Sequence, residues 1–183
     1  MAGRRQRTRE VTNLTADPLR SPDGIEIRPA EAADADAVQA LLADLVRTLT
    51  GKEDCGSSVE DILHHGFGET PHFEVLIAEA GGTAVGMVLF FYNYSTWRGR
   101  LGVYVQDIHV VEPFRSRGLG GGLLAAAARR GRAKGCTHLR LSVHPENEAA
   151  LAFYERMGLE VRRDEAICQV SGVSFHLLAE VWA

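Results

Sequence analysis

The first third of the chain shows one strand-like and two helical patterns of apolar residues. Ile25–Arg28 alternates apolar and polar side chains and ends at a proline, which predicts a short strand. Apolar residues then recur at helical spacing across Val38–Leu49, which predicts a helix that ends at Gly51. Ser57–Gly66 opens with the residue spacing of a capping box and predicts a second, shorter helix.

Three strand-like runs follow, and the segments between them predict an antiparallel meander. The runs are Phe73–Glu79, Ala84–Tyr94 and Gly102–Val111. Two glycines, 81 and 82, separate the first two runs, and the polar segment Ser95–Arg100 separates the last two. Because short connections join antiparallel strands, we expect the three runs to be neighbours in one sheet.

Beyond Pro113 helical and strand-like patterns alternate. Four elements are expected there: a helix over Leu123–Lys134, a strand over Leu139–Val143, a helix over Glu148–Met157 and a final strand near Val173–Val181. The whole order is β-α-α-β-β-β-α-β-α-β. It predicts an α+β protein with a mixed, mainly antiparallel twisted sheet, flanked by helices around a central βαβ unit.

The chain is long enough for one domain with a substantial core. It has 183 residues, of which 45% are hydrophobic. Residues 1–24 differ from the rest, because five arginines outnumber three acids and prolines punctuate the segment. We expect 1–24 to be a disordered or loosely attached arm, with a basic partner-binding tail as the alternative, and 25–183 to form a single domain.

Charge and cysteine usage exclude several function classes. Twenty Lys and Arg against 24 Asp and Glu give a net charge of −4, which does not support nucleic-acid binding. The longest apolar stretch, Val85–Tyr92, is far shorter than a membrane span. Cys55, Cys136 and Cys168 are scattered and form no C-x-x-C pair, which argues against a disulfide framework and a metal site. We therefore expect a soluble cytoplasmic protein without a metal.

The most informative segment is a glycine cluster that opens a helix directly after a strand. Gly118–Gly122 can turn the backbone so that successive N–H groups point outward, and the helix start adds its unpaired N–H groups. Arg115 and Arg117 add positive charge, so the segment predicts a phosphate or pyrophosphate site. No Lys-Ser or Lys-Thr of a Walker loop is present, and Leu123 stands where a dinucleotide loop needs its third glycine.

Two motifs carry a family resemblance. The R-x-x-G-x-G pattern of Arg115, Gly118 and Gly120 resembles the acetyl-coenzyme-A (acetyl-CoA) loop of the GNAT N-acetyltransferase superfamily. The segment Asn147–Leu159 resembles the signature N-x-x-A-x-x-F-Y-x-x-x-G-[FL] of the same superfamily, in the expected order along the chain. The resemblance implies the GNAT fold, with the βαβ unit as the acetyl-CoA-binding part.

Further segments resemble the diamine (spermidine/spermine) acetyltransferases within that superfamily. They are Asp61–Glu79, the aromatic hairpin Phe91–Arg100 and the strand Val105–Val110, and the similarity extends over about residues 25–180. Gln106 replaces a glutamate of that family, and Ser95 replaces an aspartate. Because those acids attract cationic amines, the acceptor stays open between a polyamine, a diamine and an amino-acid-like amine.

The resemblance also implies roles for individual residues. Acetyl-CoA is the expected co-substrate. Its contacts are expected from one strand, the glycine loop and the later helix: Ile108, His109, Val110, Arg115, Ser116, Arg117, Gly118, Leu119, Gly120, Gly121, Asn147 and Tyr154. Tyr154 is the expected general acid. The acceptor is expected to contact Tyr94, Trp97, Gln106 and Asp107. Family resemblance also implies a homodimer.

The general base stays open between Asp107, acting through water, and His109. On an extended strand these two side chains share one face, and Gln106, Ile108 and Val110 share the other, so only one set can line the site unless a bulge intervenes. No cysteine has an activating context, which favours direct transfer over a covalent acetyl-enzyme.

Four basic residues end the glycine-loop helix: Arg129, Arg130, Arg132 and Lys134. They form either a solvated face that complements the helix dipole or a contact to the 3′-phosphate of the coenzyme.

Three functions are compared. The leading hypothesis is an acetyl-CoA-dependent N-acetyltransferase that acts on a small-molecule primary amine. The alternatives are a protein or peptide N-acetyltransferase, which the bulky hairpin around Trp97 disfavours, and a non-catalytic acyl-CoA sensor. Gln106 motivates the sensor hypothesis, and Tyr154 argues against it.

Overall fold

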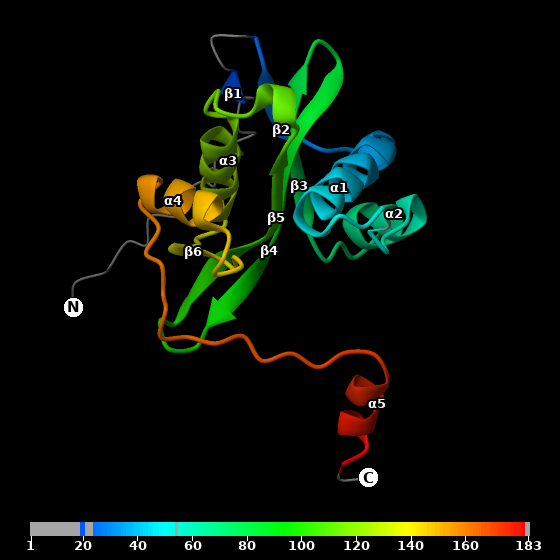
Figure 1. Cartoon of the computed structure of the whole chain (residues 1–183), viewed down its shortest axis with the longest axis vertical. Helices are drawn as coiled ribbons and strands as arrows, with labels where there is room; N and C mark the ends of the chain where they lie inside the picture. Colours follow the sequence, from blue (N-terminus) through cyan, green and yellow to red (C-terminus); the bar gives the residue numbers. More distant parts are fainter. Residues whose placement is uncertain (1–18, 21–23, 54, 182–183) are drawn as a thin grey trace, which may run out of the picture. The chain divides into compact units, whose positions relative to one another are not determined.

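The computed structural model describes residues 19–20, 24–53 and 55–181 of the chain (Figure 1). They belong to two compact units, one that ends at Ser142 and one that begins at Val143. The first unit holds all the strands and three of the helices, and the second holds two short helices.

The first unit is built on one sheet whose strands lie in sequence order. The strands are β1 (Leu19–Arg20), β2 (Glu26–Pro29), β3 (Glu74–Ala80), β4 (Thr83–Ser95), β5 (Arg100–Val110) and β6 (His138–Leu141). Every neighbouring pair is antiparallel except β5 and β6, which are parallel. The predicted α+β class, the antiparallel meander and the central βαβ unit are therefore confirmed.

Helices cover both faces of this sheet (Figure 1). Helices α1 (Ala35–Thr50) and α2 (Val59–Phe67) pack together on one face, and α3 (Leu119–Ala133), which joins β5 to β6, lies on the other. Ser58 caps α2 through a capping box with Asp61, one residue later than the predicted spacing, and its side chain accepts a hydrogen bond from the backbone N–H of Asp61. Gly51, in the left-handed conformation, ends α1 as expected.

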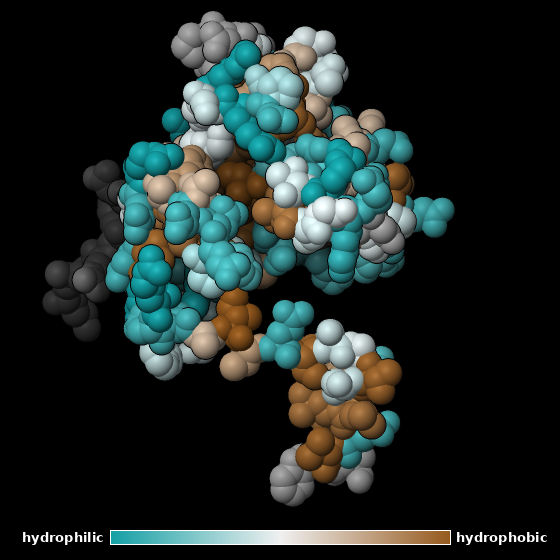
Figure 2. Space-filling view, viewed as in Figure 1, coloured by the Kyte–Doolittle hydropathy of each residue, from teal (hydrophilic) through white to brown (hydrophobic). Residues whose placement is uncertain are grey.

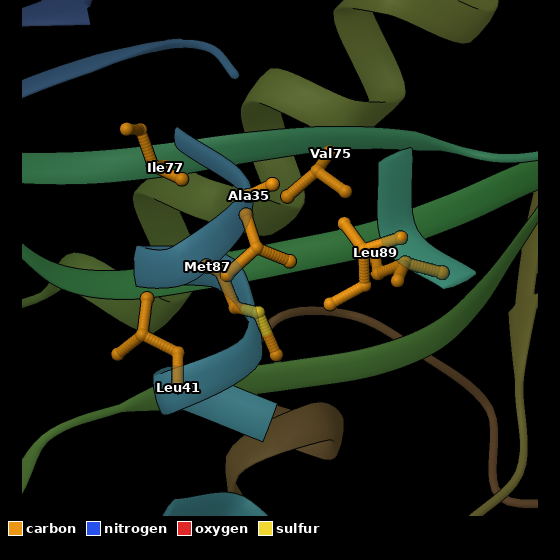
Figure 3. Close-up of a cluster of buried hydrophobic side chains, with 8 residues drawn as sticks. Ala35, Leu41, Val75, Ile77, Met87 and Leu89 are labelled. Atoms are coloured by element: carbon orange, nitrogen blue, oxygen red, sulfur yellow. The ribbon is translucent and has the colours of Figure 1, made fainter. Parts of the chain in front are cut away.

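The core on the α1 face joins that helix and α2 to the middle of the sheet (Figure 3). Its buried members come from α1, α2, β3 and β4: Ala35, Val38, Leu41, Ile62, Val75, Ile77, Met87 and Leu89. On the other face α3 approaches β5 closely, because a Cβ at Gly131 would lie 2.2 Å from Val103 Cγ2. Glycine at this position therefore lets the helix lie directly on the sheet.

The second unit contains α4 (Glu148–Arg156) and α5 (Val173–Ala179). The expected final strand near Val173–Val181 was wrong, because α5 occupies that segment. Residues 162–181 are exposed and pair with no strand among the described residues, and a strand without a neighbour cannot satisfy its backbone groups. A helix satisfies them locally, as in the bond from the Phe175 N–H to the Gly172 carbonyl. Figure 2 shows apolar side chains gathered over α5.

Two smaller differences concern the ends of the expected elements. Leu19 and Arg20, within the expected arm, form β1 and pair with β2, whereas 1–18 and 21–23 lie outside the described residues. Helix α3 begins at Leu119, earlier than the apolar pattern predicted, because its first turn consists mostly of glycine and carries no periodic signal.

Candidate active site

The glycine loop combines left-handed backbone with an uncapped helix start. Ser116 and Gly118 have φ values of 61° and 79°, and Ser116 is the only non-glycine residue with positive φ in the described part of the chain. Gly118 is the N-cap of α3, and it makes no side-chain cap. A Cβ on Gly118 would meet nothing within 4 Å. No side chain therefore caps the first turn of α3, and its unpaired N–H groups suit an anion.

Both arginines of the loop are exposed, and each contacts a neighbouring group. Arg115 donates a hydrogen bond from Nε to the carbonyl of Val110 over 2.8 Å. The guanidinium of Arg117 lies 5.1 Å from the ring centroid of Phe114. These contacts hold two positive charges beside the start of α3.

No described strand pairs with the outer edge of β5 over its second half. β6 pairs with β5 only from Gly102 to Val105. The Val111 N–H donates to Val85 on the β4 side, so strand alternation directs the N–H and carbonyl groups of Ile108 and Val110 to the opposite edge. The strand therefore presents backbone groups to an extended ligand, and the Val110 carbonyl is the one that Arg115 contacts.

A bulge in β5 separates the expected site residues. Leu89 pairs with Asp107 and Phe90 pairs with Val105, so Gln106 is the extra residue on β5. Gln106 is exposed. Asp107 and His109 share the α1 face, since their cross-strand partners Leu89 and Met87 belong to the α1 core. Because of the bulge, Gln106 does not follow the alternation of side chains between the two faces of β5. The predicted choice between the two strand faces therefore does not apply to Gln106.

Asp107 carries a half-buried carboxyl group without a side-chain partner among the described residues. Burial is the cause that raises the pKa of this carboxyl above its ordinary value. A carboxylate with a raised pKa is a stronger proton acceptor than a solvated one. Asp107 therefore stays the predicted general base, with a carboxyl group whose burial fits that role.

His109 is buried, with 4% of its surface exposed, and it is bound to α1. Its Nε2 lies 2.6 Å from Oδ2 of Asp44. The hydrogen bond from His109, followed by that from Arg47, lowers the pKa of Asp44. Sequence reasoning missed Asp44, although a carboxylate three residues after Leu41, on the apolar side of α1, was a signal for a buried polar partner.

Two expected site residues lie on α4 in the second unit. Asn147 is the N-cap of α4, and its Oδ1 accepts a hydrogen bond from the Ala150 N–H over 3.1 Å. Tyr154 is buried, and burial raises the pKa of its phenol. The phenol therefore keeps its proton at neutral pH, as a general acid requires.

The aromatic hairpin between β4 and β5 lies apart from Asp107. Trp97 is in the turn with 99% of its surface exposed, and Tyr94 is 61% exposed. Strand alternation puts Tyr94 on the α3 face of β4, opposite to the face of Asp107. Within the first unit, the structure does not bring these expected acceptor contacts together with Asp107.

Two of the four basic residues at the end of α3 have a partner that was not expected. Glu74 of β3 accepts hydrogen bonds from Arg130 and from the hydroxyl of Tyr92, and Lys134 Nζ lies 3.2 Å from its Oε1. Burial acts to raise the pKa of Glu74, but the bonds and charges of Arg130 and Lys134 prevail and lower it. Arg129 and Arg132 are exposed.

Three further features of the described part of the chain concern its cysteines, its potential metal ligands and its helices. Its three cysteines are free, and burial raises the pKa of Cys136, which disfavours a thiolate. No group of three or more His, Cys, Asp or Glu side chains there could hold a metal ion. None of the described helices is long and apolar enough to cross a membrane.

Comparisons with known proteins agree with this geometry. The acetyltransferase (GNAT) family model matches residues 39–159. Thialysine N-epsilon-acetyltransferase of Bos taurus is 32% identical over 144 residues, covering 74% of this chain and 84% of that protein. Spermidine/spermine N(1)-acetyltransferase-like protein 1 of Homo sapiens is 27% identical over 145 residues, covering 75% of this chain and 21% of that protein.

A solved structure supports the fold independently. An aminoglycoside N-acetyltransferase in complex with CoA matches with a TM-score of 0.65 at 23% identity, over 80% of this chain and 94% of that chain. The family match spans the glycine loop, the bulged strand β5 and the α4 signature. The chain therefore belongs to the acetyltransferase (GNAT) family and is an N-acetyltransferase.

Proposed function

We propose that the protein transfers the acetyl group of acetyl-CoA directly to a small aliphatic primary amine. The observation that carries this proposal is Asp107, a half-buried carboxyl group with a raised pKa and no side-chain partner among the described residues, on a strand whose outer edge pairs with β6 only as far as Val105. Related acetyltransferases are named for thialysine and for spermidine or spermine, which are aliphatic amines. They support this acceptor class.

The residues of the first unit fit acetyl-CoA. The left-handed loop and the uncapped start of α3, from Ser116 to Gly121, offer N–H groups for the diphosphate, with Arg115 and Arg117 beside them. The backbone of Ile108 and Val110, and the strand segment through His109, would align the pantetheine arm along the free edge of β5. When bound, acetyl-CoA supplies the activated acetyl group as a thioester.

Asp107 would take the proton that the amine must lose before it can attack. A protonated amine has no free electron pair, so a base must accept its proton at an oxygen of the Asp107 carboxyl, directly or through water. Gln106 cannot accept a proton and would contact the acceptor only through hydrogen bonds. His109 is the weaker candidate, because its Nε2 is already bound to Asp44.

Tyr154 would donate its phenolic proton to the departing sulfur. Its burial keeps the phenol protonated, which a general acid needs. Asn147 would help to hold the coenzyme through the helix that it caps, because its own Oδ1 is engaged by Ala150. Direct transfer fits the absence of an activated cysteine among the described residues.

The test is a thiol-release assay with acetyl-CoA and a panel of thialysine, lysine, ornithine, putrescine and spermidine, with product masses read by mass spectrometry. We expect acetylation of at least one amine. Tyr154→Phe should lower kcat by about 10²-fold while CoA affinity, measured by calorimetry, changes little. No heat with CoA would contradict the proposal, and heat without an acceptor would favour the sensor alternative.

The homodimer that the resemblance implies and the cytoplasmic location that cysteine usage indicates stay predictions.

A further inference from the structure

A stacked pair of aromatic rings lies on the same sheet face as Asp107. Phe91 of β4 and Tyr104 of β5 are cross-strand partners, with ring centroids 5.0 Å apart and ring planes at 24°. Phe91 lies two residues beyond Leu89, whose cross-strand partner is Asp107, so both side chains point to the α1 face. The ring pair is therefore the next cross-strand pair along this face from Asp107.

The ring pair is held in place and stays partly exposed. The hydroxyl of Tyr104 lies 2.8 Å from Oγ of Ser142, the residue directly after β6. Met87 and Leu89, on the same face, are buried under α1, whereas Phe91 and Tyr104 stay partly exposed. On this face the buried core under α1 therefore ends near Asp107, and the partly exposed ring pair lies beyond it.

We propose that the Phe91–Tyr104 pair is the subsite for the carbon chain of the acceptor amine. This inference rests on the proposed function, because it needs the reacting nitrogen at Asp107. Same-face positions along a strand repeat about every 7 Å, so the first methylenes of an extended chain lie against the rings. A pre-ordered apolar surface binds hydrocarbon without a cost for ordering side chains. The pair therefore selects unbranched alkyl amines.

A series of linear primary amines from propylamine to hexylamine tests this subsite. For the unmodified protein kcat/KM should rise roughly fourfold per added methylene, the factor that corresponds to burying one CH₂ group. In Phe91→Ala the rise should fall below about twofold per methylene, mainly through KM, because the chain loses the surface it buries. Ser142→Ala removes the partner of the Tyr104 hydroxyl. It should reduce the increase in kcat/KM per methylene less than Phe91→Ala does.

Leu49→Ala is the matched control, since it removes an exposed apolar side chain of α1 and should leave the rise unchanged. If Phe91→Ala does not fold by circular dichroism, Phe91→Leu and Ser142→Ala decide the question. An unchanged rise in folded variants would overturn the subsite and leave the rings as a stabilising cross-strand pair. An unmodified protein that acetylates no amine would instead contradict the proposed function itself.

Discussion

Two carboxyl groups in the same sheet have opposite surroundings. Glu74 of β3 points to the α3 face and is bound by Arg130, Lys134 and Tyr92. Asp107 of β5 points to the α1 face and has no side-chain partner among the described residues. The pKa of Glu74 is lowered by its partners, and the pKa of Asp107 is raised by burial alone. The comparison separates a carboxylate that ion pairs hold in the fold from one that we propose accepts a proton.

The two groups should also affect stability in opposite directions as pH changes. The folded state holds the Asp107 proton more tightly than the unfolded state, so Asp107 costs stability as pH rises through its raised pKa. Glu74 binds its proton more weakly when folded. Its contribution is therefore present above its ordinary pKa of 4.5 and is lost as pH falls through the lowered value.

The largest expected effect comes from Asp107→Asn. Without a proton acceptor at this position, kcat/KM should fall by at least about 10²-fold. At pH 7 the variant should be more stable than the unmodified protein, because a buried carboxylate without a partner is removed. Urea unfolding at pH 7 and pH 4 measures this, and the gain should shrink at the lower pH.

Retained CoA binding by calorimetry is the control for an intact coenzyme site in Asp107→Asn. A variant that keeps full activity would show that His109, rather than Asp107, accepts the proton. A variant that is less stable at pH 7 would show that Asp107 has a stabilising partner in solution, and the comparison would then fail.

Glu74→Gln should act in the opposite way. Losing the carboxylate leaves Arg130 and Lys134 with a neutral partner, and the free energy of unfolding at pH 7 should fall by about 1–3 kcal/mol. The loss should fade in acid, where Glu74 is protonated in both states, and kcat should change little. Glu53→Gln, which alters a carboxylate with an 83% exposed side chain, is the control and should have almost no effect.

Asp44→Ala tests a third carboxyl group. Asp44 has a side-chain partner, as Glu74 does, but it belongs to α1, which packs on the sheet face of Asp107. It leaves the buried Nε2 of His109 without its acceptor, so the free energy of unfolding should fall by about 1–2 kcal/mol. Asp44→Asn keeps an acceptor oxygen and should recover part of that loss. Equal losses in both variants would mean that the charge of Asp44, rather than the hydrogen bond, stabilises the pair.

The patterns along the chain predicted the meander, the central βαβ unit and the glycine loop because each is a local signal. Register is not local: the bulge at Gln106 appears only when Phe90 pairs with Val105. Partners distant in sequence, such as Asp44 and His109, also depend on how α1 packs. The final strand failed for the same reason, because the apolar alternation across Val173–Val181 forms a strand only beside another strand.

The smallest expected effect tests how much of the Glu74 cluster depends on a single neutral donor. Tyr92→Phe removes one hydroxyl, 3.1 Å from Oε1 of Glu74, and keeps the ring near Lys134. Arg130 and Lys134 still neutralise Glu74, so the free energy of unfolding should fall by only about 0.5–1.5 kcal/mol. Urea unfolding of Tyr92→Phe, Glu74→Gln and the double variant measures the coupling. A coupling near zero would assign the stability of this cluster to its charges, whereas a coupling equal to the whole Tyr92 effect would mean that the hydroxyl acts only through Glu74.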